Sequence, residues 1–214
     1  MPTSMRFFVA AIALFVLVPA SDAAAQRRRG LVDVSRPHER HGAWLSFGLG
    51  AGQDSYRYDA DPSFGHELTK PSFFLAAGGT VNPHLRLGGE INAWVNHYTD
   101  DSGYGITESL VGGLLTAQVY PVRSLGLFVK GGLGISRSGA DVSGGGGYGP
   151  AETGFAYLYG AGYELKVARN FFITPLVTVL NHRSSQGSRD PDPLGTLHER
   201  VVMLGVGLTF QPGR

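Results

Sequence analysis

One segment near the end of the chain carries the residue types of a nucleophilic hydrolase site. The run Asn181-His182-Arg183-Ser184-Ser185 places an imidazole two residues before a hydroxyl, and Glu199 supplies a carboxylate further along. In a Ser-His-acid triad the serine attacks, the histidine takes its proton and the acid orients the histidine. His182, Ser184 and Glu199 are therefore the candidate base, nucleophile and orienting acid. The alternative is that these residues only reflect the composition of a polar loop.

Other chemistries find little support in the residue inventory. The chain has no Cys, which excludes a thiol nucleophile, a disulfide framework and thiolate metal ligands. The glycine run 144–147 lacks the Lys-Ser/Thr pair of a phosphate-binding loop, and His38-Glu39-Arg40-His41 lacks the spacing of a zinc-binding helix. With 18 Lys and Arg against 17 Asp and Glu, the net charge of +1 gives no general basis for binding nucleic acid. We expect no metal, no cofactor and no nucleic-acid partner.

The composition of the chain differs from that of an ordinary soluble domain. Of 214 residues, 32 are Gly, 43% are hydrophobic and 16% are charged. Soluble domains typically contain about 25% charged residues and about 7% Gly. The chain is therefore rich in glycine and poor in charge, without the three-residue period of collagen.

The first residues have the pattern of a signal peptide. The apolar run 7–18 is too short for a membrane-spanning helix, and Ala23-Ala24-Ala25 supplies small residues for cleavage. We predict a signal peptide over 1–25, cleaved after Ala25, followed by a basic leader over 26–42. The alternative is an uncleaved N-terminal anchor.

The rest of the chain alternates with a period of two. Between residues 85 and 98, Leu85, Leu87 and Ile91 share one face, whereas Arg86 and Glu90 share the other. Short and long connections alternate between such segments. The predicted strands cover 43–52, 71–81, 85–98, 107–120, 125–137, 154–167, 171–182 and 198–210.

This arrangement predicts an all-β fold, an eight-stranded antiparallel up-and-down barrel that spans a membrane. Strands of this length can cross the hydrocarbon core when tilted, and short periplasmic turns opposite longer external loops are typical of outer-membrane barrels. The alternative is a soluble lipocalin-like barrel, which would need more charged outer surface. We expect a monomer in contact with outer-membrane lipid and lipopolysaccharide.

Alternation also assigns the interior of the barrel. With the apolar face toward lipid, six polar residues point inward and form the predicted interior network: Arg86, Glu90, Asn92, Lys130, Glu164 and Lys166. Because isolated buried charges are costly, we predict that Glu90 and Glu164 pair with Arg86, Lys130 or Lys166. An eight-stranded barrel is just wide enough for side chains to fill it, which predicts a packed polar interior. A narrow porin-like ion path is the alternative.

Several segments are typical of a known class. Gly131-Gly-Leu-Gly-Ile135, Gly160-Ala-Gly-Tyr-Glu-Leu165, Arg169-Asn170 and Pro175 resemble the small outer-membrane barrels of the OmpA/OmpX-like class, and the resemblance covers 43–210. The final segment, Met203 to Phe210, is similar to the C-terminal signal read by the barrel-assembly machinery of Gram-negative bacteria. OmpA itself has a peptidoglycan-binding domain after its barrel, whereas here a tail of 211–214 follows.

A second resemblance bears on the hydrolase hypothesis. The outer-membrane lipid A 3-O-deacylases share an eight-stranded barrel, a His-x-Ser step and a later Glu, which would make His182, Ser184 and Glu199 catalytic. The chain departs from them at Ser185, where those enzymes usually have Asn, and in the longer gap to Glu199. Their site faces lipid, whereas alternation turns Glu199 inward. We therefore expect a non-enzymatic outer-membrane barrel whose external loops carry recognition, with a deacylase and a narrow channel as alternatives.

Overall fold

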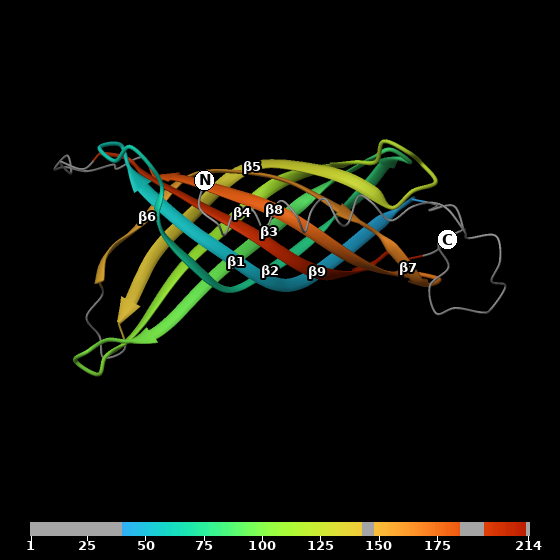
Figure 1. The fold of residues 1–214 in the computed structure, drawn as a ribbon. Coiled ribbons are helices and arrows are strands. Elements are labelled where there is room, and N and C mark those ends of the chain that lie inside the picture. Colours follow the sequence, from blue (N-terminus) through green and yellow to red (C-terminus); the bar gives the residue numbers. More distant parts are fainter. Residues whose placement is uncertain (1–39, 143–147, 185–194, 213–214) are drawn as a thin grey trace. The chain divides into compact units, whose positions relative to one another are not determined.

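The computed structural model describes residues 40–142, 148–184 and 195–212, which form an antiparallel sheet that closes on itself (Figure 1). Each strand pairs with its neighbour in sequence, and pairings of β1 with β9 and of β6 with β8 complete the ring. The short β7 continues the position of β6 beside β8, so the barrel has eight strand positions, as predicted. The strands are β1 (Ala43–Tyr58), β2 (Gly65–Asn82), β3 (Leu85–Thr99), β4 (Gly105–Val119), β5 (Leu127–Val142), β6 (Tyr148–Tyr163), β7 (Leu165–Ala168), β8 (Phe171–Ser184) and β9 (Leu197–Phe210).

The two faces of the alternating strands form an apolar outer surface and a filled interior. Leu49, Leu115 and Ile135 expose 67%, 78% and 67% of their surface, whereas the inward Arg86 and Glu90 expose 1% and 2%. A barrel in water would bury its apolar face, because a large exposed apolar surface is unfavourable there. The outer wall therefore suits lipid, and the lipocalin-like alternative does not fit this structure.

The connections differ from the prediction at one end of the barrel. The predicted loop over 53–70 shrinks to 59–64, because β1 and β2 remain paired well beyond their apolar segments. Outward residues there are polar, as at Gln53 and Glu67, so the hydrophobic alternation ends while the backbone ladder continues. We call this end the loop end, and the end with connections 83–84, 120–126 and 169–170 the turn end.

One predicted strand is interrupted near the turn end. The segment 154–167 was expected to be continuous, but the pairing of β6 stops at Tyr163 and resumes in β7 at Leu165. Between them, the amide of Glu164 donates to the carbonyl of Gly126, 2.9 Å away. The Glu164 side chain still points into the barrel, as alternation predicts, and is 1% exposed.

Two inward glycines have different structural roles. A Cβ at Gly134 would collide with the backbone of Gly113 and Leu114, so glycine permits close approach of β4 and β5. A Cβ at Gly162 would meet the ring of Phe128, so this glycine makes room for an aromatic side chain. No helix among the described residues is long and apolar enough to cross a membrane.

Candidate functional site

Charged side chains meet inside the turn end: they come from β3, from β5, from the break between β6 and β7, and from the segment ahead of β1. Arg86 on β3 donates from Nη1 to Glu164 Oε1 at 2.5 Å and to the hydroxyl of Tyr120 at 2.9 Å. The Tyr120 hydroxyl also lies 3.0 Å from Glu164 Oε1. Arg86 Nη2 donates to Oε1 of Gln211 at 2.6 Å. The buried guanidinium is thus hydrogen-bonded on both terminal nitrogens, which is how a buried charge is tolerated.

A residue ahead of the first strand joins this group. Arg40 is 4% exposed, its guanidinium lies 3.6 Å from the centre of the Tyr120 ring, and its Nε is 3.5 Å from Glu164 Oε2. It also donates to the carbonyls of Arg123 and Leu125. Burial lowers the pKa of Arg40, against the opposing effect of Glu164, and burial raises the pKa of Tyr120. The leader predicted over 26–42 therefore contributes a side chain to the interior.

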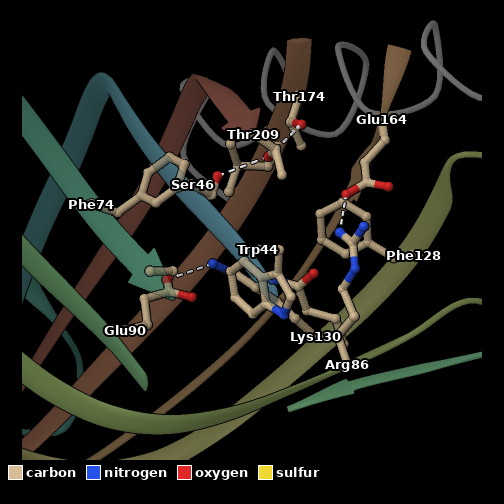
Figure 2. Close-up of a pocket in the computed structure, with 13 residues that line it drawn as sticks. Trp44, Ser46, Phe74, Arg86, Glu90, Phe128, Lys130, Glu164, Thr174 and Thr209 are labelled. Atoms are coloured by element: carbon tan, nitrogen blue, oxygen red, sulfur yellow. Dashed lines mark hydrogen bonds and ion pairs between the residues drawn. The ribbon is translucent and has the colours of Figure 1, made fainter. Parts of the chain in front are cut away.

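Lys130 and Glu90 form the second ion pair of the turn end. Lys130 Nζ donates to Glu90 Oε1 at 2.5 Å, and Asn92 Nδ2 donates to the same oxygen at 3.1 Å. Figure 2 shows this pair and the Arg86–Glu164 pair around one small cavity, whose free volume of about 10 Å³ is at the lower limit for a single water molecule. Lys166, the remaining member of the predicted network, is half-buried on β7 and is not a partner in either ion pair.

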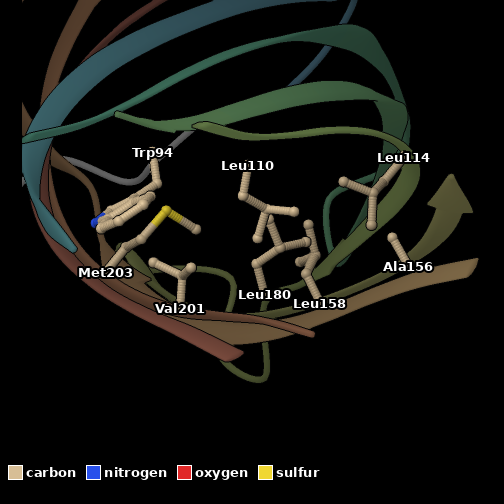
Figure 3. Close-up of a cluster of buried hydrophobic side chains, with 8 residues drawn as sticks. All are labelled: Trp94, Leu110, Leu114, Ala156, Leu158, Leu180, Val201 and Met203. Atoms are coloured by element: carbon tan, nitrogen blue, oxygen red, sulfur yellow. The ribbon is translucent and has the colours of Figure 1, made fainter. Parts of the chain in front are cut away.

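Apolar side chains fill the middle of the barrel, where we had expected polar ones. Leu110, Leu180 and Val201 are at most 1% exposed and lie in one cluster (Figure 3). We call this cluster the apolar layer. It consists of Trp94, Leu110, Leu114, Ala156, Leu158, Leu180, Val201 and Met203.

The prediction of a polar interior failed here because β4 is apolar on both faces. Leu110 and Leu114 point inward, and Val111 and Leu115 point outward. Consecutive apolar residues give no alternation from which the inward face can be recognised. Trp94, a member of the layer, donates a hydrogen bond from Nε1 to the carbonyl of Gly52 on β1, 2.9 Å away.

Beyond the apolar layer, the loop end of the interior is acidic. Asp54, Glu108, Glu152 and Glu199 come from four different strands, and Glu199 lies within electrostatic range of the other three. Among the described residues, none of the four forms an ion pair. Glu108 accepts a hydrogen bond from Asn96 Nδ2 at 2.8 Å. No group of three described His, Asp or Glu side chains is placed to hold a metal ion.

The candidate triad lies on the inside of this loop end. Cross-strand pairing places His182 directly opposite Glu199, and Ser184 follows two residues later on the same face. Exposures of 1%, 7% and 1% for His182, Glu199 and Ser184 show that none faces lipid. His182 Nδ1 bonds Ser136 Oγ on β5 at 2.6 Å, whereas within the described part of the chain His182 Nε2 and Ser184 Oγ have no hydrogen-bond partner. The structure brings the three residues to one region without connecting them as a relay.

Sequence reasoning missed several polar residues that the structure places in the interior, among them Arg40 and Gln211. Arg40 and Gln211 flank the first and last strands, where no alternation exists to assign them a face. Gln211 connects the two chain ends, because its Nε2 donates to the carbonyl of His41 at 2.6 Å while its Oε1 accepts from Arg86. Ser136, by contrast, shares the inward face of Lys130, as alternation over 125–137 predicts.

A closed eight-stranded antiparallel barrel with an apolar wall and a filled interior defines the class: the protein folds as a small outer-membrane β-barrel. It is similar to Ail, the attachment invasion locus protein of Yersinia pestis, whose structure was solved with the heparin analogue sucrose octasulfate. That likeness has a TM-score of 0.52 at 17% identity and covers 79% of this chain and 99% of Ail. Neisserial surface protein A is also similar, with a TM-score of 0.50 at 15% identity over 80% of this chain and 99% of that one. These likenesses establish the fold.

A scan against protein-family models gives no match, and no curated protein matches the sequence. Because one fold can host many functions, the function is inferred from the geometry of this chain's own residues.

Proposed function

We propose that the protein is a non-enzymatic, non-conducting barrel of the Gram-negative outer membrane that presents its loop end to the outside for surface interaction. The observation that carries this proposal is the apolar layer across the interior. Export would use the signal peptide over 1–25 with cleavage near Ala25, and the strand ending at Phe210 would be read by the barrel-assembly machinery. The turn end would then face the periplasm.

The apolar layer argues against ion conduction. Leu110, Leu158 and Leu180 are between 0% and 2% exposed, so their part of the lumen is filled with side-chain carbon. An ion crossing the layer would lose its hydration without gaining polar partners, which is strongly unfavourable. The paired charges of the turn end oppose entry from the other side, because Arg86 and Lys130 already bind carboxylates.

The position of the candidate triad argues against lipid hydrolysis. An acyl chain of the surrounding lipid lies against the outer wall, while His182 and Ser184 are buried on the inner face. The proton-accepting role also requires His182 to bond the nucleophile, and its observed bond goes to Ser136. Both features favour a structural role for these residues.

The test is the conductance of the refolded protein in a planar lipid bilayer. The wild type should show no unitary currents above the bare bilayer, because the apolar layer blocks the lumen. The matched double variant, Leu110→Gly with Leu180→Gly, removes two side chains of the layer. It should show measurable current, because water and ions can enter the opened lumen. Stable unitary currents from the wild type would contradict the proposal.

A parallel assay addresses the enzyme alternative. Purified wild-type protein incubated with lipid A should release no fatty acid. Release that Ser184→Ala abolishes would overturn the non-enzymatic assignment and would leave the conductance result unaffected.

A further inference from the structure

Arginines line up on the outer wall at the loop end of β8, β9 and β1. The strand register places His198 directly beside Arg183 on one side and beside Arg57 on the other. Arg200 lies two residues further along β9 on the same outward face. We call Arg57, Arg183 and Arg200 the arginine row.

The row has no anionic partner among the described residues. The carboxylates of the adjoining connection are engaged elsewhere: Asp59 binds His198 Nε2 at 2.8 Å and the amide of Thr196 at 3.1 Å, and Asp61 accepts from the amide of Tyr58 at 3.0 Å. Like charges on neighbouring strands are destabilising unless something neutralises them. Among the described residues, the row is therefore left with positive charge that nothing neutralises.

An aromatic ring orients two of the three guanidinium groups. Those of Arg200 and Arg57 lie 4.1 Å and 5.4 Å from the centre of the Phe64 ring. A guanidinium that stacks through its face keeps the N–H groups at its edge available for bidentate binding of a phosphate. Arg200 Nε is itself a buried donor without an acceptor among the described residues. The Phe64 ring thus partly preorganises the row by holding two of its guanidinium groups.

The height of the row matches the edge of the hydrocarbon. Phe210 and Phe171, whose rings lie 5.1 Å apart, mark the aromatic edge of the wall at the turn end. Going along β9 from Phe210 to Arg200, a rise of about 3.3 Å per residue and a tilt of about 40° give a vertical separation of roughly 25 Å. That distance is about the thickness of the apolar band of an outer-membrane barrel. The row therefore lies where the phosphate groups of the surrounding leaflet begin.

We propose that the arginine row binds the phosphate groups of a phosphorylated glycolipid in the leaflet around the loop end. This inference rests on the proposed function, because it needs the loop end to lie in the outer leaflet. Neighbouring strands are about 4.8 Å apart, so three strands spread the row over roughly 10 Å. That span exceeds one phosphate and suits a headgroup that carries at least two. On β2, the strand beside β1, the outward residues Glu67 and Thr69 carry no positive charge.

The experiment measures retention of diphosphorylated lipid A by native mass spectrometry of the full-length refolded protein in mild detergent. The wild type should retain lipid A in preference to phosphatidylcholine. The triple variant Arg57→Gln, Arg183→Gln and Arg200→Gln should reduce retention at least about tenfold. The reason is that a single hydrogen bond to a charged group changes an affinity by about a factor of ten. The triple Lys variant keeps the charge without the bidentate edge and should give an intermediate loss. Arg123→Gln with Arg169→Gln removes two exposed charges at the turn end and should leave retention unchanged.

Several outcomes would overturn the proposal. Full retention by the triple Gln variant would do so, as would an equal loss in the turn-end control. Displacement of lipid A by millimolar inorganic phosphate would indicate a site for the free anion. A sulfated oligosaccharide that binds through the same arginines in preference to lipid A would assign the row to a soluble polyanion.

Two further measurements test the folding of each variant and the proposed function independently of lipid A retention. Heat-modifiable migration on a detergent gel reports that each variant is a folded barrel. Should the triple variant not fold, the single Arg183→Gln variant answers the question, because this side chain is exposed and forms no ion pair within the described part of the chain. Conductance of the wild type would refute the non-conducting barrel without changing lipid retention.

Discussion

The two polar ends of the barrel interior use carboxylates in different ways. At the turn end, Glu164 is bonded to Arg86 and lies beside Arg40, and Glu90 is paired with Lys130. At the loop end, Asp54 and Glu199 belong to an acidic group without a cationic partner among the described residues. The apolar layer lies between them.

The difference shows what each end contributes. Paired buried charges fix the positions of the segments that carry them, and losing one member leaves an uncompensated buried charge. Carboxylates that repel one another oppose folding unless water or a cation reaches them. The turn end is therefore expected to stabilise the barrel, while the loop end is expected to tolerate substitution.

The largest expected effect comes from the turn end. Arg86→Met should lower the free energy of unfolding by about 3–5 kcal/mol, because Glu164 and Gln211 lose a buried partner. Urea unfolding in lipid vesicles measures this change. Arg169→Met, at an exposed position of the same end, is the control and should change stability by less than about 0.5 kcal/mol. Equal losses of unfolding free energy in both variants would show that the buried network contributes no more to stability than an exposed arginine.

The apolar layer should come next. Leu180→Ala should cost about 2–5 kcal/mol, because a buried leucine leaves a cavity. Leu115→Ala changes the same residue type on the lipid side, where Leu115 is 78% exposed, and should cost clearly less in the same vesicles. A larger loss at Leu115 would mean that the inward and outward faces are assigned incorrectly.

A pair of glycines sharpens the contrast between inside and outside on neighbouring strands. Gly134→Ala should destabilise by about 1–3 kcal/mol, since its methyl group would meet the backbone of β4. Gly113→Ala, where a Cβ meets nothing within 4 Å, should be close to neutral. Thermal unfolding of the two variants in one detergent gives the comparison, and the reverse ranking would contradict the packing described.

The smallest effect is expected outside the barrel wall, at the loop end. Hydrogen bonds from His198 and from the Thr196 amide lower the pKa of Asp59 to about 2. Because the folded-state pKa is depressed, the stabilisation is present above the ordinary pKa of about 3.9 and is lost as the pH falls toward 2. A carboxyl NMR titration of Asp59 should show this midpoint, and His198→Gln should raise it. A wild-type midpoint near 3.9 would show that the contact does not form.

Much of the fold could be predicted because a strand has a simple period. In 85–98 the alternation of Leu87, Gly89 and Ile91 with Arg86 and Glu90 gives both the strand and its inward face, and the structure has that face inside. The eight strand positions follow from the same signal. The ends of β1 and β2 could not be predicted, because their ladder continues after the hydrophobic alternation has stopped.

The candidate site was less accessible to sequence reasoning. Alternation indicates that Glu164 points inward, but its partners depend on which strands meet across the lumen and on a flanking residue, Arg40. The apolar layer was missed because Leu110 and Leu114 sit next to outward apolar residues. The arginine row depends on register, since Arg57 and Arg183 are far apart in sequence and both lie beside His198.

The most direct test of the contrast between the two ends makes the same type of substitution, Glu to Gln, once at each end. Glu164→Gln and Glu199→Gln each replace a buried carboxylate by an amide of the same shape, and urea unfolding in identical vesicles compares them. We predict that Glu164→Gln lowers the free energy of unfolding by about 3 kcal/mol or more. Glu199→Gln should leave it unchanged or raise it by up to about 1 kcal/mol, because like-charge repulsion is relieved. Equal losses at both positions, or a larger loss at Glu199, would contradict this prediction.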